Sequence, residues 1–199
     1  MSCQMISVTA LNRLANKNAL AILIGASFLV NTAIGAEHKF SDEYAMEVDP
    51  AAKQQLGDKT YGELMEFFHE AEKAIETRDL KALMNLYSES YTDGEHDKKS
   101  AEEIWARIFA TFEMTATRHN MRLVKMGEDK NMVVFSCSGL LLGVPNPNAR
   151  MKQKGIITID NWAMQDHVLV KEAGKWKLIG TYGPERKRLW FDKPMHPLF

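Results

Sequence analysis

The chain has 199 residues, of which 45% are hydrophobic and 26% are charged, which suits one globular domain with a sizeable core. Its formal net charge is -1 at pH 7, and its lysines are scattered among acidic residues. The sequence therefore lacks the basic stripe that binds a phosphate backbone, and nucleic acid is not an expected partner.

The first 36 residues differ in composition from the rest of the chain. Arg13 and Lys17 are their only charged residues, and an apolar run follows over residues 19–30 before a stretch of small residues. This order predicts a secretory signal peptide over residues 1–36 and a secreted, periplasmic protein. The alternative is an N-terminal membrane anchor, but the apolar run is shorter than the roughly 18 residues that a spanning helix needs. After cleavage Cys137 is the one remaining cysteine, so no internal disulfide is expected.

Residues 37–58 show no sustained hydrophobic period and contain Pro50 and Gly57, so they are predicted to form an N-terminal arm. The domain itself is expected over residues 59–183. Residues 184–199 are predicted to be a C-terminal tail. The tail carries large aromatic side chains between prolines, which favours docking on a partner or on the domain itself.

Three amphipathic helices are predicted at the start of the domain. In the first, apolar side chains recur at steps of three and four residues from Leu64 to Ile75. Asp79 is the expected N-cap of the second helix, which is predicted to run as far as Tyr87. Ser100, with a glutamate three residues later, predicts a capping box at the start of the third.

The chain after Thr115 is typical of β-strands. The stretches 121–127 and 131–144 flank one turn, and 154–171 and 175–183 flank another. Helices followed by antiparallel strands predict an α+β fold. We expect three N-terminal helices to pack on one face of a strongly curved, mainly antiparallel sheet.

Two stretches carry a family resemblance. AIETRDLKALMNLYSESY, residues 74–91, and HVLVKEAGKWKLIGTY, residues 167–182, resemble the helix pair and the last hairpin of nuclear transport factor two-like and SnoaL-like domains. This cone-shaped superfamily also includes ketosteroid isomerase and the association domain of calmodulin-dependent kinase. The resemblance covers about residues 61–183 and implies the fold. It implies little about activity, because this fold hosts both enzymes and binding modules.

Asp166 and His167 are neighbours in a predicted strand, where successive side chains point to opposite faces. They are therefore not expected to act as a hydrogen-bonded pair. By alternation alone, Trp162 and Met164 share the face of Asp166, and this more apolar face would bury Asp166.

The resemblance implies the opposite orientation. In the family, the residue before the first valine of this hairpin lines the pocket, and here that residue is His167. Gln165 and Ala163 would then share the pocket face. The other face of such sheets commonly forms a dimer interface, so a homodimer through the outer sheet face is expected.

The predicted function is binding of a small apolar or carboxylate-bearing ligand in the cone pocket, with His167 and Arg118 as polar anchors. The resemblance to the kinase association domain implies that Cys137 also faces the pocket, where we expect a small hydrophobic side chain and not a reactive thiol. The predicted pocket residues are Tyr91, Trp105, Phe109, Arg118, Phe135, Cys137, Gln165 and His167.

Two alternatives remain open at this point. In the first, the protein is an acid-base enzyme, such as an isomerase, cyclase or dehydratase, with Asp93 or Glu95 as base and His167 as acid. Asp93 and Glu95 follow the second helix where the isomerase places its base, although ordinary turn chemistry also explains them. In the second, the chain is a non-catalytic assembly module of an envelope complex. No cofactor is expected, and the histidine spacing favours no metal site.

Overall fold

The computed structural model describes residues 46–94 and 96–183. The predicted signal peptide, Glu95 and the predicted C-terminal tail lie outside the described residues. In chain order the described elements are β1 (Met46–Val48), α2 (Ala51–Leu56), α3 (Asp58–Glu76), α4 (Leu80–Met84), β2 (Tyr87–Asp93), β3 (His96–Asp97), α5 (Lys98–Thr111), β4 (Phe112–Met126), β5 (Met132–Pro145), β6 (Ile157–Glu172) and β7 (Lys175–Tyr182).

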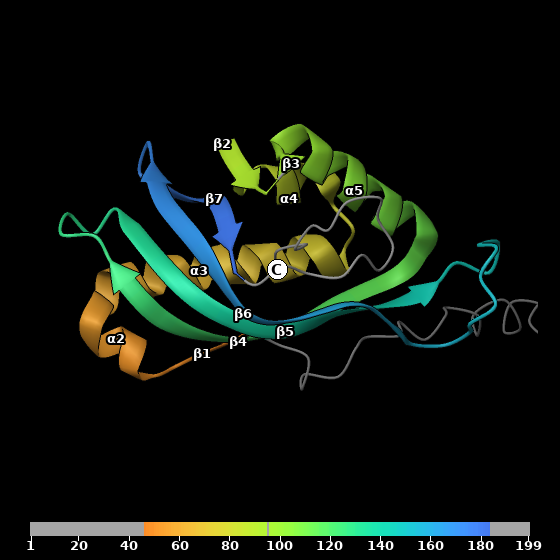
Figure 1. Cartoon of the computed structure of the whole chain (residues 1–199), viewed down its shortest axis with the longest axis horizontal. Coiled ribbons are helices and arrows are strands. Elements are labelled where there is room, and N and C mark those ends of the chain that lie inside the picture. The colour runs from red at the N-terminus through yellow and green to blue at the C-terminus, as the bar shows by residue number, and fades with distance from the viewer. Residues whose placement is uncertain (1–45, 95, 184–199) are drawn as a thin grey trace, which may run out of the picture. The chain divides into compact units, whose positions relative to one another are not determined.

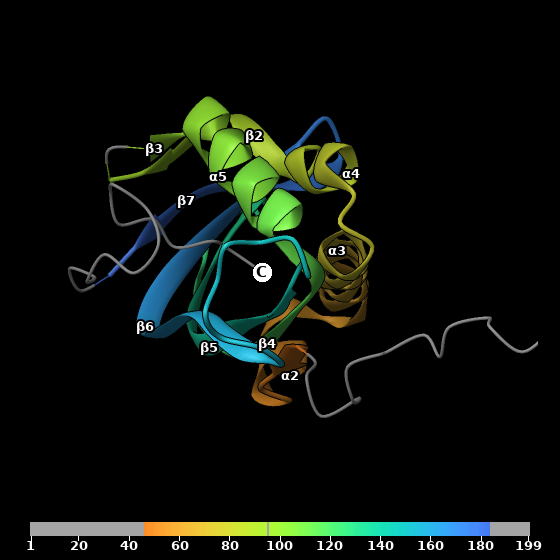
Figure 2. The same ribbon diagram turned by 90° about the vertical axis from the view of Figure 1, so that its right-hand side faces the viewer.

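The described strands form one sheet of seven in the order β1-β4-β5-β6-β7-β2-β3. The pairs β4/β5, β5/β6 and β6/β7 are antiparallel, whereas β1 and β2 join β4 and β7 in parallel. The sheet is strongly curved, and α3 and α5 lie on its concave side (Figures 1 and 2). The predicted α+β fold is thus confirmed. We call the face of the sheet that α3 and α5 cover the inner face.

The predicted stripe of α3 forms the helical half of the core. The buried side chains of α3 are Leu64, Phe67, Phe68, Ala71, Ala74 and Ile75. Phe68 meets Phe135 of β5 edge to face, with ring centroids 5.5 Å apart. Burying these side chains fixes α3 against the inner face, since most helix stability in proteins comes from packing an apolar face.

The two later helices differ from expectation at their ends. Asp79 does cap α4, and its carboxylate accepts a hydrogen bond from the Ala82 N–H at 2.9 Å. However, α4 ends at Met84, and Tyr87 begins a strand. Asp97, and not Ser100, is the N-cap of α5: the Asp97 carboxylate accepts the Ser100 N–H and the Ser100 hydroxyl accepts the Asp97 N–H.

Part of the predicted N-terminal arm belongs to the domain. Met46–Val48 pair with β4, and Ala52 and Leu56 of α2 are buried in the core. Elements this short have no hydrophobic period of their own, which is why the pattern of the sequence missed them. None of the described helices is both long enough and apolar enough to cross a membrane.

Candidate functional site

Strand β4 gives the inner face a polar run that the sequence analysis did not recognise. Its buried inward residues are Thr115, Thr117, His119 and Met121. Arg118, between Thr117 and His119, is exposed. The chain was expected to be typical of strands after Thr115, with the strand itself over residues 121–127, but β4 begins at Phe112. Alternation counted backward from Met121 would have placed His119 and Thr117 on the inner face.

A β-bulge in β6 sets which side chains of that strand point inward. Cys137 of β5 pairs with Gln165 of β6, and Gly139 of β5 pairs with Trp162 of β6. The two positions are two residues apart on β5 but three residues apart on β6, so β6 has one extra residue between them. Met164 takes up the extra residue with φ of 54°, and its N–H donates to the Ser138 hydroxyl at 3.2 Å. The bulge inverts the alternation, so that Trp162 and Gln165 point to the same face.

Because of this bulge, the predicted orientations of two β6 side chains are wrong. Trp162 is buried on the inner face and not on the face of Asp166, whereas Ala163, expected to face inward, is exposed. Gln165 and His167 are buried on the inner face, and Asp166 is half-exposed. The prediction that Asp166 and His167 lie on opposite faces is confirmed.

Gly139 makes room for the Trp162 ring on the inner face. A Cβ atom at position 139 would lie 2.8 Å from Cζ2 of Trp162 and 2.2 Å from the Arg118 carbonyl oxygen. Without that atom, the indole ring lies against His119, with ring centroids 5.0 Å apart. His167 meets the other side of this cluster, and its ring centroid is 6.3 Å from that of His119.

Cys137 lies at the centre of the same cluster. The Trp162 indole N–H donates to its Sγ at 3.2 Å, and Nδ1 of His119 lies 3.2 Å from the same sulfur. Burial raises the pKa of the Cys137 thiol to about 12, with the Trp162 hydrogen bond opposing the shift. The thiol is therefore neutral in ordinary solution and is no nucleophile, since the thiolate is the reactive form.

A second polar group lies where β2 meets β7. Thr181 is the cross-strand partner of His167, and Tyr91 packs edge to face on Tyr87 with centroids 4.7 Å apart. The hydroxyls of Tyr91 and Thr181 are buried, and among the described residues neither has a hydrogen-bond partner of good geometry. Burial first, then Tyr87 and Asp93, raises the pKa of Tyr91 well above 10.0, while the nearby Thr181 hydroxyl lowers it slightly.

The remaining predicted pocket residues divide into two groups. Trp105 and Phe109 of α5 are buried with ring centroids 5.4 Å apart, and the Trp105 indole donates to the Tyr87 hydroxyl at 2.9 Å. Phe135 is buried as the cross-strand partner of His167. Arg118 is exposed on the opposite side of β4 from His119, so its prediction as a pocket anchor is wrong.

Of the two predicted bases, Asp93 is half-buried at the end of β2, and Glu95 lies outside the described residues. Within residues 46–94 and 96–183, no group of three or more histidine, cysteine, aspartate or glutamate side chains is arranged to hold a metal ion. We refer to the buried inner-face set as the interior site; it consists of Tyr91, Thr117, His119, Cys137, Trp162, Gln165, His167 and Thr181.

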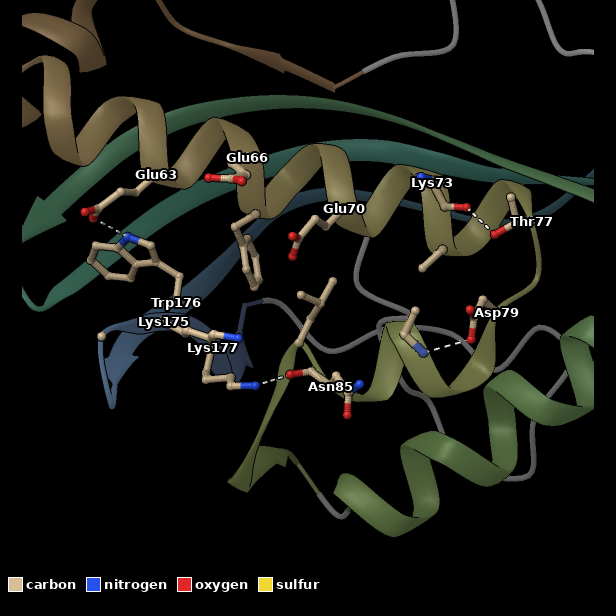
Figure 3. A pocket seen from close by; sticks show the side chains of 15 residues that line it. Glu63, Glu66, Glu70, Lys73, Thr77, Asp79, Asn85, Lys175, Trp176 and Lys177 are labelled. Atoms are coloured by element: carbon tan, nitrogen blue, oxygen red, sulfur yellow. Dashed lines mark hydrogen bonds between the residues drawn. The ribbon is translucent and has the colours of Figure 1, made fainter.

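A separate groove of about 890 Å³ lies on the outside, between α3 and the β6–β7 hairpin (Figure 3). Glu63, Glu66 and Glu70 line it from α3, and Lys175 and Lys177 line it from β7 (Figure 3). Its charged walls are exposed or half-exposed, which is ordinary for solvated side chains.

Several polar groups of this groove already have partners in the domain. The Lys171 ammonium donates to Glu63 at 2.6 Å, and the Trp176 indole donates to the same carboxylate at 3.3 Å. Lys177 donates to the Asn85 carbonyl. No buried side chain with an unsatisfied polar atom lines this groove among the described residues, in contrast to the interior site.

Comparison with known proteins supports the fold and no more. No family profile matches the sequence, and no curated protein is similar to it. A proposed scytalone dehydratase from Novosphingobium aromaticivorans superposes with a TM-score of 0.51 at 11% identity, over 64% of this chain and 85% of that one. A proposed dehydratase of the NTF2-like family from Streptomyces avermitilis gives 0.46 at 14% identity, over 63% and 95%.

Bd1075 of Bdellovibrio bacteriovorus matches with a TM-score of 0.45 at 12% identity, over 61% of this chain and 40% of that protein. This chain thus spans less than half the length of Bd1075. At sequence identities this low, structural similarity indicates a shared fold and does not indicate a shared activity. The chain has the α+β fold of nuclear transport factor two-like proteins, with a polar and aromatic interior site on the inner face of its sheet.

Proposed function

We propose that this protein is a secreted domain that binds a small, mainly apolar molecule, carrying one or more hydrogen-bonding oxygen atoms, at the interior site. The observation that carries the proposal is the set of buried hydroxyls of Tyr91, Thr117 and Thr181, which have no hydrogen-bond partner of good geometry among the described residues, although the Tyr91 and Thr181 hydroxyls lie near each other. Leaving a buried polar group unsatisfied costs about 1–3 kcal/mol, so native proteins rarely keep several of them. A bound molecule with matching polar atoms would supply the missing partners.

The surroundings of these hydroxyls suit an apolar or aromatic ligand body. Tyr87 packs on Tyr91, Phe135 is the cross-strand partner of His167, and Trp105 and Phe109 come from α5. Ligand sites are typically apolar with a few placed polar groups. Because Arg118 points away, the anchors we propose are the Tyr91 and Thr181 hydroxyls and the imidazole of His167.

Native mass spectrometry of protein purified from its own envelope fraction tests the proposal. We expect a bound small molecule in the wild type, and its loss in the double variant Tyr91→Phe/Thr181→Val. The matched control is Tyr182→Phe, which removes the same hydroxyl from a side chain that is 60% exposed. Ordered water is the competing occupant. Wild-type protein that carries no small molecule, and binds none from an extract of the same envelope, would contradict the proposal.

An acid-base enzyme is the second candidate, and one observation favours it. Asp93 lies close enough to Tyr91 for its charge to raise the Tyr91 pKa, after burial and Tyr87. A base at Asp93 would then act beside the same ligand, with His167 as acid. Asp93→Asn separates the two candidates: an enzyme would lose turnover of the bound molecule and keep its affinity, whereas a binding protein shows no turnover in either form.

We also propose export through the signal segment and a homodimer through the outer sheet face. Four half-buried residues are cross-strand neighbours on that face: Met132 with Val170, and Val134 with Val168. Met164, in the bulge of β6, is 67% exposed. An apolar sheet face of this kind suits a symmetric partner. Light scattering of wild type and Val168→Glu tests the dimer, and N-terminal sequencing of the exported protein tests cleavage after residue 36.

A further inference from the structure

His96 is a buried histidine that lies outside the set of residues defining the interior site. It belongs to β3, the strand at one end of the sheet, and it is 6% exposed. Its Nε2 is buried and has no hydrogen-bond partner among the described residues. Buried polar atoms in native proteins nearly always have a partner, so this nitrogen calls for a group that the domain itself does not supply.

The backbone fixes the direction in which His96 points. Asp93 of β2 is its cross-strand partner, and Asp97, directly after it, is the N-cap of α5. The Asp97 carboxylate accepts the Ser100 N–H at 2.8 Å, and α5 accordingly starts beside β3 (Figure 2). Side chains directly opposite each other in an antiparallel pair point to the same face of the sheet. His96 therefore shares the face of Asp93.

That face is the inner face, which also carries Tyr91. Tyr91 is buried two residues before Asp93 on β2, with the exposed Thr92 between them, so Tyr91 and Asp93 point to the same side. Tyr91 is thus the diagonal neighbour of His96 across the strand pair, at about 7–8 Å, which is within reach of an aromatic side chain. Both side chains end in a buried polar atom without a partner among the described residues, Nε2 and the hydroxyl.

The strand register continues this polar stretch to His167. The register of β2 on the parallel strand β7, extended by one residue, places Asp93 beside Thr181. Thr181 is in turn the cross-strand partner of His167. One row on the inner face therefore runs from His167 through Thr181 and Asp93 to His96, and the interior site extends as far as β3.

The surroundings of these groups disfavour an anion. Burial raises the pKa of Tyr91, and Tyr87 and the Asp93 carboxylate raise it further. Burial and the Asp93 charge equally oppose negative charge on a ligand oxygen beside the Tyr91 hydroxyl. A hydroxyl group is uncharged and both donates and accepts, so it matches the Tyr91 hydroxyl, and it matches Nε2 of His96 in either tautomer.

We propose that His96 is a ligand-binding residue of the interior site, where its Nε2 and the Tyr91 hydroxyl together bind the hydroxyl group of an uncharged phenol or alcohol. This inference rests on the proposed binding function and narrows its ligand class. A site built to hydrogen-bond a hydroxyl group discriminates against analogues that lack it, because its buried polar groups are then left unpaired.

Three probes with the same ring system test the ligand class on the full-length protein in neutral buffer: 2-naphthol, naphthalene and 2-naphthoate. Fluorescence titration measures the three dissociation constants. We expect 2-naphthol to bind about tenfold more tightly than naphthalene, as about one net hydrogen bond contributes, and 2-naphthoate to bind more weakly than 2-naphthol. Equal affinities for naphthol and naphthalene, or naphthoate binding as tightly as naphthol, would overturn the proposal.

Variants of the full-length protein locate the effect at His96. His96→Phe keeps a ring of similar shape and removes Nε2, so the preference for naphthol over naphthalene should fall by about threefold or more. His96→Gln keeps a polar group near the position of Nε2 and should restore part of the preference. Thr92→Val, on the exposed side of β2, is the matched control, and no change is expected. Because the preference is a ratio measured within one variant, a general loosening of the site weakens both probes alike.

Failure of His96 and failure of the underlying function give different results. If the probes bind and His96→Phe keeps the full preference for naphthol, the binding function is supported and the role of His96 is overturned. If no probe binds and protein from its envelope fraction carries no small molecule, both are contradicted. If no probe binds but a native molecule is found, its chemistry decides. An uncharged hydroxyl compound that His96→Phe loses supports the inference, and a carboxylic acid or a compound without a hydroxyl group overturns it.

Discussion

Trp162 lies across Gly139, so that its indole ring reaches the imidazole of His119 on the next strand. The contact depends on two local features: the missing Cβ at Gly139, and the β6 bulge that turns Trp162 inward. Together they build the aromatic part of the interior site, and the Trp162 indole N–H donates to Cys137.

Gly139→Ala is expected to lower the free energy of unfolding by about 1–3 kcal/mol, because overpacking forces neighbouring groups off their positions. The new Cβ would lie 2.2 Å from backbone oxygen, which cannot move as a side chain can. Urea unfolding measures the change. Gly62→Ala is the control, since nothing lies within 4 Å of its Cβ position on α3. There we expect a gain of about 0.5–1 kcal/mol from helix propensity.

Because its thiol is buried, we expect Cys137 to react slowly with alkylating reagents. Its pKa of about 12 keeps it protonated, so iodoacetamide at about pH 8 should leave Cys137 unmodified in the folded protein and alkylate it after unfolding. Peptide mass spectrometry locates the modification. A raised pKa contributes stability that is present below the ordinary value of 9.0 and is lost as pH rises through about 12. Rapid alkylation of folded protein would contradict the burial of this thiol.

Removing the Tyr91 hydroxyl should cost the unliganded protein nothing. Tyr91→Phe deletes a buried polar atom that has no hydrogen-bond partner of good geometry among the described residues, so we expect a change between zero and a gain of about 1 kcal/mol in the free energy of unfolding. Chemical denaturation measures it, with Tyr182→Phe as the exposed comparison. A loss of more than about 1 kcal/mol would mean that the hydroxyl already has a structural partner, and would weaken its proposed role as a ligand anchor.

The Glu63–Lys171 ion pair is expected to stabilise the fold at neutral pH and to lose this effect in acid. The hydrogen bond from Lys171, opposed by burial and aided by Trp176, lowers the pKa of Glu63 from 4.5. The pair therefore stabilises the fold above pH 4.5, and this contribution is lost as pH falls through the lowered value. Glu63→Gln should cost roughly 0.5–1 kcal/mol at neutral pH and less in acid.

Denaturation of the Glu63→Gln variant at two pH values checks this. Glu66→Gln, on the same helix and lining the same outer groove, is the control, and no change is expected there at either pH. An equal cost of Glu63→Gln at both pH values would show that the carboxylate charge has no part in the effect.

The sequence by itself determined the elements that have a strong period. The apolar stripe of α3, the cap at Asp79 and the hairpin at Ala173 and Gly174 follow from local rules, because these depend on residues near in the chain. Opposite faces for Asp166 and His167 also followed, since no bulge lies between them. The inward orientation of His167 needed the family resemblance.

Only the tertiary structure decided how the interior site is assembled. One extra residue in β6, at Met164, reverses the facing of Trp162, and simple alternation has no means of detecting it. His119, Cys137 and Trp162 come from three strands, and the space at Gly139 that lets them meet is a property of packed neighbours. Side-chain periodicity fixes which residues share a strand face, but only the strand register brings residues distant in sequence within hydrogen-bond reach.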